Sequence, residues 1–130
     1  MNTTSVSIAT TEQFKRALLS LRDKNLPDTH LSMLKAQAKG EQAMITSSKL
    51  AEVAGYVNYN AANLQYGTLG CNLGAFLDYT PPKRKDGTFI WWTVLSYSID
   101  GNAEPETGHF QFVMRPELLD ALREMKWVRQ

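Results

Sequence analysis

The chain has 130 residues and a formal net charge of +1, which allows one hydrophobic core but not two domains of ordinary size. Its content of 43% hydrophobic and 21% charged residues is that of a soluble globular protein, and no run of about 18 apolar residues predicts a membrane span. The pI near 7.8 lies below the value of about 9 that is typical of strongly basic nucleic-acid-binding domains, so any such surface must come from the placement of charges.

The first nine residues are rich in Ser and Thr and predict a disordered tail ahead of a single domain over residues 10–130. They have neither the positive start nor the apolar stretch of a secretory signal. A lone cysteine, Cys71, cannot form an intramolecular disulfide, which fits a reducing cytosol. We therefore expect a cytoplasmic protein in which Cys71 is a packing residue.

Local signals predict three helices in the first half of the chain. The first is capped by Thr10 or Thr11 and runs to about Lys24, and the second runs from Asp28 or Thr29 to Gly40. The third is short, with a cap at residue 46 or 47 and its end at Gly55, where a left-handed turn residue is favourable.

A fourth helix is predicted from about Tyr59. Its inner face is expected to carry Ala62, Leu69, Leu73, Phe76 and Leu77, and its opposite face Gln65, Thr68 and Asn72. A stripe of Gly67, Gly70 and Gly74 costs about 1 kcal/mol per glycine in a helix. We expect this stripe to permit close approach of another backbone, which is a packed helix, DNA, or a second copy in a homodimer.

The rest of the chain predicts a β-hairpin and a last helix. Residues 89–99 alternate as a strand, an acidic loop follows, residues 109–115 return as a second strand, and Pro116 stands in the first turn of the helix. This order predicts a mainly helical α+β fold: a winged helix-turn-helix with an extra N-terminal helix, a β-hairpin wing and a C-terminal helix.

Residues 53–77 contain no charged side chain but are rich in amides and tyrosines. Amides donate and accept hydrogen bonds at once, as base edges require, and the second helix of a helix-turn-helix enters the major groove. The predicted DNA contacts in this segment are Asn58, Tyr59, Asn60, Asn63, Gln65, Tyr66 and Thr68. Asn58 and Asn60 have an alternative role as turn and cap residues.

Four cations are predicted to contact phosphates. Lys49 lies in the first helix of the motif, and Lys83, Arg84 and Lys85 form a cluster whose alternative is a solvated loop. Because Asp100, Glu104 and Glu106 make the wing tip acidic, we expect that tip to stay out of the minor groove.

Trp91, Trp92 and Trp127 could stack on bases, but large aromatics on a hairpin are usually core, and we expect this of Trp91 more than of Trp92. His30 and His109 lack the spacing of metal ligands, and the carboxylates show no acid/base pairing. We therefore expect neither an enzyme nor a metal or cofactor site.

Three segments resemble a known domain: TSSKLAEVAGYVNYNAANLQYGTLG, PPKRKDGTFIWW and FVMRPELLDALREMKWV. The domain lies beside the nuclease domain in predicted bacterial restriction endonucleases of the HNH class. The resemblance covers about residues 30–128 and is most specific at LAEVAGY, NLQYG and MRPEL. It implies a winged-helix-like module that reads DNA sequence or base modification. The nuclease half has no counterpart here, so we expect the recognition module alone.

Two functions remain open from the sequence. One is binding of double-stranded DNA as a recognition module in a restriction or mobile-element system. The other is a protein-interaction module, such as a phage or plasmid inhibitor, or a partner subunit, of a nuclease or defence complex. The uncharged amide-rich helix and the Lys83–Lys85 cluster favour the first, whereas the near-neutral charge and the acidic loop favour the second.

Overall fold

The computed structural model describes residues 7–98 and 109–129 and shows a mainly helical α+β fold. The described residues form five α-helices, two short 3-10 helices and one three-stranded antiparallel sheet. In chain order the elements are α1 (Thr11–Lys24), α2 (Asp28–Lys39), η2 (Glu41–Ala43), β1 (Met44–Thr46), α3 (Ser47–Ala54), α4 (Tyr59–Gly74), η3 (Trp91–Val94), β2 (Ser96–Ser98), β3 (Gln111–Met114) and α5 (Pro116–Glu124).

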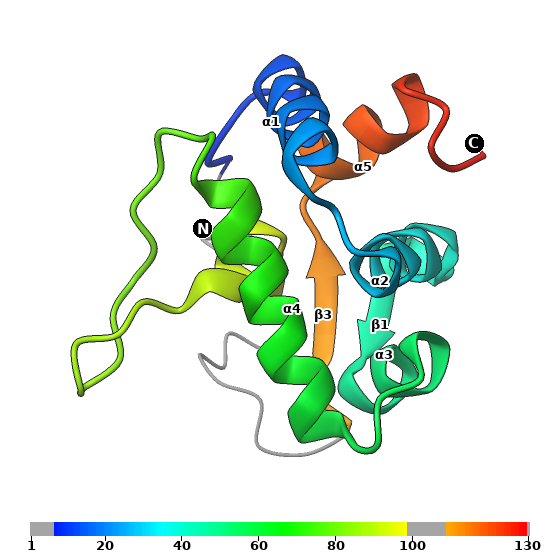
Figure 1. Cartoon of the computed structure of the whole chain (residues 1–130), viewed down its shortest axis with the longest axis vertical. Coiled ribbons are helices and arrows are strands. Elements are labelled where there is room, and N and C mark those ends of the chain that lie inside the picture. The colour runs from blue at the N-terminus through cyan, green and yellow to red at the C-terminus, as the bar shows by residue number, and fades with distance from the viewer. Residues whose placement is uncertain (1–6, 99–108, 130) are drawn as a thin grey trace.

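The sheet has the order β1-β3-β2, so the last strand in the chain lies in the centre. Ile45 pairs with Phe112 on one side of β3, and Ser96 pairs with Met114 on the other. Figure 1 shows α4 crossing in front of β3, α2 and α3 beside the sheet, and α1 next to α5 at one end. The core forms where α4 covers the sheet: the rings of Tyr66 and Phe112 are 4.7 Å apart.

The helices α1 and α3 begin where their predicted caps lie. The hydroxyl of Thr10 accepts from the N–H of Gln13, whose side chain returns the bond, and the hydroxyl of Thr46 accepts from the N–H of Lys49. The third helix ends at Gly55, which has φ of 79°. Local chemistry alone therefore explains where α1 and α3 begin and where α3 ends.

Two of the three stripe glycines permit close packing, as predicted. A Cβ added at Gly70 would lie 2.2 Å from the carbonyl oxygen of Trp91, and one at Gly74 would lie 3.0 Å from the Trp91 ring. Gly67 differs, because nothing lies within 4 Å of its would-be Cβ. The partner of the stripe is thus η3 of the same chain, at least for Gly70 and Gly74.

The predicted strand over residues 89–99 is wrong over most of its described length. Residues 91–94 form η3, and only Ser96–Ser98 pair in the sheet. The hydroxyl of Thr93 donates to the carbonyl of Ile90 (2.7 Å), and the N–H of Leu95 donates to the carbonyl of Trp92 (3.0 Å), so the backbone is wound tightly at this point. This winding seats the Trp91 carbonyl against Gly70, a long-range contact that alternation of side chains could not reveal.

The predicted boundary between tail and domain at residue 10 falls close to the start of the described residues. Residues 1–6 lie outside the described part of the chain, but Ala9 is buried in the core, so the folded region begins before Thr10. The strand β1 was not predicted. The acidic loop with Asp100, Glu104 and Glu106 lies outside the described residues.

We predict opposite effects of alanine at two neighbouring glycines. Gly70→Ala should lower the free energy of unfolding by about 1–3 kcal/mol, because the new methyl group would overlap the Trp91 backbone. Gly67→Ala should raise it by about 0.5–1 kcal/mol, because the site is open and alanine favours the helix. Urea denaturation followed by circular dichroism measures both, and equal effects would contradict the packing described above.

Candidate nucleic-acid interface

The outward face of α4 combines polar side chains with one exposed apolar side chain and carries no charged residue. Asn60 and Thr68 are exposed on it, as predicted, and Leu64 between them is 69% exposed. Val57, in the turn that leads into the helix, is 90% exposed. No role was predicted for Leu64 or Val57.

Tyr66 and Gln65 do not belong to this face, so their prediction as DNA contacts needs correction. Tyr66 is fully buried, and its hydroxyl bonds to the side chains of Gln37 and Ser96. Burial raises the pKa of Tyr66. Its position four residues after Ala62 is that of the inner face of the helix, whereas the hydroxyl of a tyrosine favoured a position on the surface. Gln65 turns towards α2, where its Oε1 lies 2.8 Å from Nε2 of His30.

The three asparagines at the start of α4 lie in different environments. Asn58 is the N-cap, with its Oδ1 accepting from the N–H of Ala61 (2.9 Å), which is the alternative role that the sequence left open. Asn60 lies past the cap and is exposed. Asn63 is half-buried, and its Oδ1 is buried with no hydrogen-bond partner in the described structure. Tyr59 is half-buried.

The predicted cation cluster lies on a small hairpin, residues 82–90, which we call the basic hairpin. The N–H of Arg84 donates to the carbonyl of Thr88 (2.7 Å), and the N–H of Ile90 donates to that of Pro82 (2.9 Å). At the tip, the carboxylate of Asp86 accepts from the hydroxyl and N–H of Thr88, and these bonds lower the pKa of Asp86. The backbone of this segment is thus ordered by hydrogen bonds across the turn.

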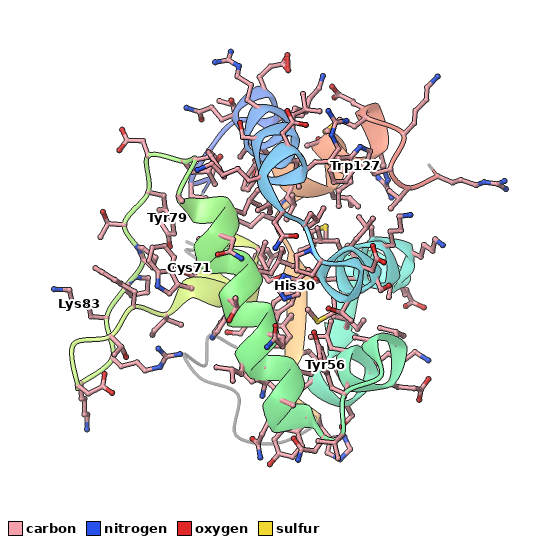
Figure 2. The ribbon with its side chains drawn as sticks, in the orientation of Figure 1. His30, Tyr56, Cys71, Tyr79, Lys83 and Trp127 are labelled. Atoms are coloured by element: carbon pink, nitrogen blue, oxygen red, sulfur yellow. The ribbon has the colours of Figure 1, made fainter. Side chains whose placement is uncertain are left out.

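The three cations of the basic hairpin are not equivalent. Lys83 and Lys85 are exposed, and Figure 2 shows Lys83 projecting outwards from the hairpin. The Lys83 ammonium lies 5.3 Å from the centre of the Phe89 ring. The guanidinium of Arg84 instead folds back, with Nη1 donating to the carbonyl of Phe89 (2.8 Å). Lys83 and Lys85 are therefore the two cations of this hairpin that project to solvent.

A groove of about 330 Å³ lies between α4 and the basic hairpin. Its helix wall includes Asn63, Gly67, Cys71 and Asn72, with the exposed Leu64 and Thr68 also lining it, and its other wall includes Arg84, Phe89, Trp91 and Trp92. In Figure 2 Cys71 is labelled on the hairpin side of α4. This groove was not predicted, because nothing local in the sequence indicates that residues 82–92 fold back along the helix.

Trp92 is more deeply buried than Trp91, the opposite of the prediction. Trp92 is buried at 5% exposure, with its ring against Phe110 and Phe112, whereas Trp91 is only half-buried. Nε1 of Trp92 is buried without a partner in the described structure. Trp127 is half-buried after α5.

Lys49, the remaining predicted phosphate contact, is exposed on α3 but ion-paired. Its Nζ lies 2.7 Å from Oε2 of Glu52. This pair is exposed and therefore contributes little to stability, yet the carboxylate offsets the positive charge of Lys49.

Comparisons with protein-family models, curated proteins and solved structures found no match to this chain. The resemblance to the HNH-associated domain therefore stays a prediction. Across the described residues no helix is long and apolar enough to cross a bilayer, and no cluster of three or more His, Cys, Asp or Glu is placed to hold a metal ion. His30 is buried beside Gln65, and His109 is exposed.

We predict that the cap and the contact asparagines separate in a stability measurement. Asn58→Ala should lower the free energy of unfolding by about 1 kcal/mol, because the N–H of Ala61 loses its acceptor. Asn60→Ala should leave it unchanged or raise it slightly, since alanine is the better helix former at an exposed position. Thermal unfolding of both variants tests this, and a comparable loss in Asn60→Ala would show that Asn60 also has a structural role.

Proposed function

We propose that this domain is a winged helix that binds double-stranded DNA with the outer face of α4 in the major groove. The order α2, β1, α3, α4, β2, β3 and the sheet order β1-β3-β2 support this reading. Residues 55–58 join α3 to α4, and a helix-turn-helix uses a turn of about three or four residues that often contains glycine. The setting that the resemblance implies, recognition for a separate nuclease in a bacterial cytoplasm, is part of the proposal.

The observation that carries the proposal is the uncovered, uncharged polar face of α4. Asn60 and Thr68 project from this face on a rigid helix, two turns apart. A good bidentate contact between an amide and adenine discriminates by about 1–3 kcal/mol, and a threonine methyl group suits the methyl of thymine. Leu64 between them offers a further apolar contact for a methyl group on a base.

Phosphate binding is assigned to Lys83 and Lys85. The basic hairpin lies alongside α4, so its exposed ammonium groups would reach the backbone beside a helix that occupies the groove. Each phosphate neutralised adds about −0.9 to the slope of log affinity against log salt concentration. With few cations on this surface, the slope should be shallow for a DNA-binding protein.

We predict that Lys83→Gln with Lys85→Gln makes this slope less negative by about 2 and weakens binding to all duplexes alike. Fluorescence anisotropy at several salt concentrations gives the slope. The matched control is Lys126→Gln with Arg129→Gln, two exposed cations beyond α5, which should leave the slope unchanged. A slope that changes equally in both double variants would contradict the assignment.

A second prediction concerns base discrimination. Asn60→Ala and Thr68→Ala should each reduce the preference for a selected duplex over a random one by about 1–3 kcal/mol, with the salt slope unchanged. Selection from a randomised duplex pool identifies the preferred site, and competition binding measures the loss. If these variants behave like the lysine variants, the division of labour between α4 and the basic hairpin is wrong.

One observation favours the alternative of a protein partner. Val57 and Leu64 are the most exposed large apolar side chains among the described residues, Leu64 one turn after Asn60 on α4 and Val57 just before the helix. Such side chains are frequent in protein–protein contacts. If no duplex, methylated or unmethylated, binds at micromolar concentration and low salt, this alternative replaces DNA binding.

A further inference from the structure

The groove between α4 and the basic hairpin has the volume and the aromatic lining of a site for a small ligand. Its volume of about 330 Å³ lies at the lower end of the range of about 300–1,000 Å³ for ligand sites. Phe89, Trp91 and Trp92 supply aromatic surface on one wall, and Gly67 leaves the facing helix wall free of a side chain. Stacking of a base on an aromatic side chain is worth about 1–3 kcal/mol and tolerates any base.

Two residues that line this groove carry polar atoms without partners. Oδ1 of Asn63 is an acceptor and Nε1–H of Trp92 is a donor, and both are buried and unpaired within the described structure. Buried polar groups are nearly always hydrogen-bonded, so an unpaired donor and acceptor in one site point to a missing partner. That partner must present both an acceptor and a donor.

We propose that this groove binds a single nucleobase, stacked on its aromatic wall and hydrogen-bonded by Asn63 and Trp92. The Watson–Crick edge of each base places an acceptor beside a donor, which in adenine and cytosine are a ring nitrogen and an amino group, so these two bases serve as probes of the pair of groups. Arg84, held at the groove by the carbonyl of Phe89, provides positive charge for the attached phosphate. The proposal rests on the proposed DNA-binding function for one source of the base.

That source is a base extruded from the duplex that α4 would contact. Asn63 lies one turn after Asn60, so the groove adjoins the helix face assigned to the major groove. Extrusion costs a few kcal/mol and is easiest for a mismatched base. The other source is a free nucleotide, which offers the same chemistry without the duplex.

The first arm of the test uses nucleosides alone, so it does not depend on duplex binding. The protein has three tryptophans, and each indole N–H gives one signal in a nitrogen–proton NMR spectrum. The signal that disappears in Trp92→Phe belongs to Trp92, and it should shift on addition of adenosine or cytidine while the Trp127 signal, assigned with Trp127→Phe, stays in place. Asn63→Ala should weaken the response about tenfold, and this variant keeps the tryptophan core intact.

The second arm measures binding to matched and mismatched duplexes. An extruded base predicts binding to the mismatched duplex that is tighter by about tenfold or more, with the gain lost in Asn63→Ala. A shift of the Trp92 signal without this gain supports the base site and identifies a free nucleotide as its ligand. If no nucleoside moves the Trp92 signal and mismatches have no effect, the base site is wrong even where duplexes bind. Conversely, a shift with nucleosides but no duplex binding removes the proposed function and leaves the base site.

Discussion

The orientation of α4 depends on one buried amide. Gln37 on α2 is fully buried, and its Nε2 donates to the hydroxyl of Ser96 (3.0 Å) and to the carbonyl of Phe112 (3.2 Å), while its Oε1 accepts from the hydroxyl of Tyr66. These bonds join two helices to two strands. A rotation of α4 about its axis would break the bond to Tyr66 and leave buried polar atoms unpaired, at about 1–3 kcal/mol for each group. The network therefore determines which side chains of α4 face outwards, and with them the composition of the candidate interface.

Much of the helical framework could be predicted from the sequence, because caps and turns are local. Thr10, Thr46 and Asn58 accept hydrogen bonds from residues three positions later, and Gly55 adopts a left-handed conformation within its own turn. The short strand β1 and the 3-10 turn η3 could not be predicted. They depend on β3 and on Gly70, which are far away in the chain, and no local pattern reports such contacts.

The candidate site was predictable to a similar extent. An uncharged amide-bearing helix with Asn60 and Thr68 on its surface follows from composition and periodicity. Tyr66 was predicted to contact DNA because the hydroxyl of a tyrosine suits an exposed position. In the fold this hydroxyl is buried and donates to Oε1 of Gln37. The groove beside α4 depends on the chain folding back after Pro82, so its lining by Trp91 and Trp92 becomes visible only in three dimensions.

The absence of charge on the exposed face of α4 has a consequence for how the domain would discriminate between DNA sites in the cell. Under the proposed DNA binding, counterion release would act through the lysines of the basic hairpin and apply equally to every sequence, whereas contacts from neutral amides and methyl groups would release no ions. A rise in ionic strength would then shorten residence on all sites by the same factor and leave the ratio between target and background occupancy nearly constant. Substitutions on α4 would then change the preference between DNA sites, and substitutions in the basic hairpin would change the affinity for all of them.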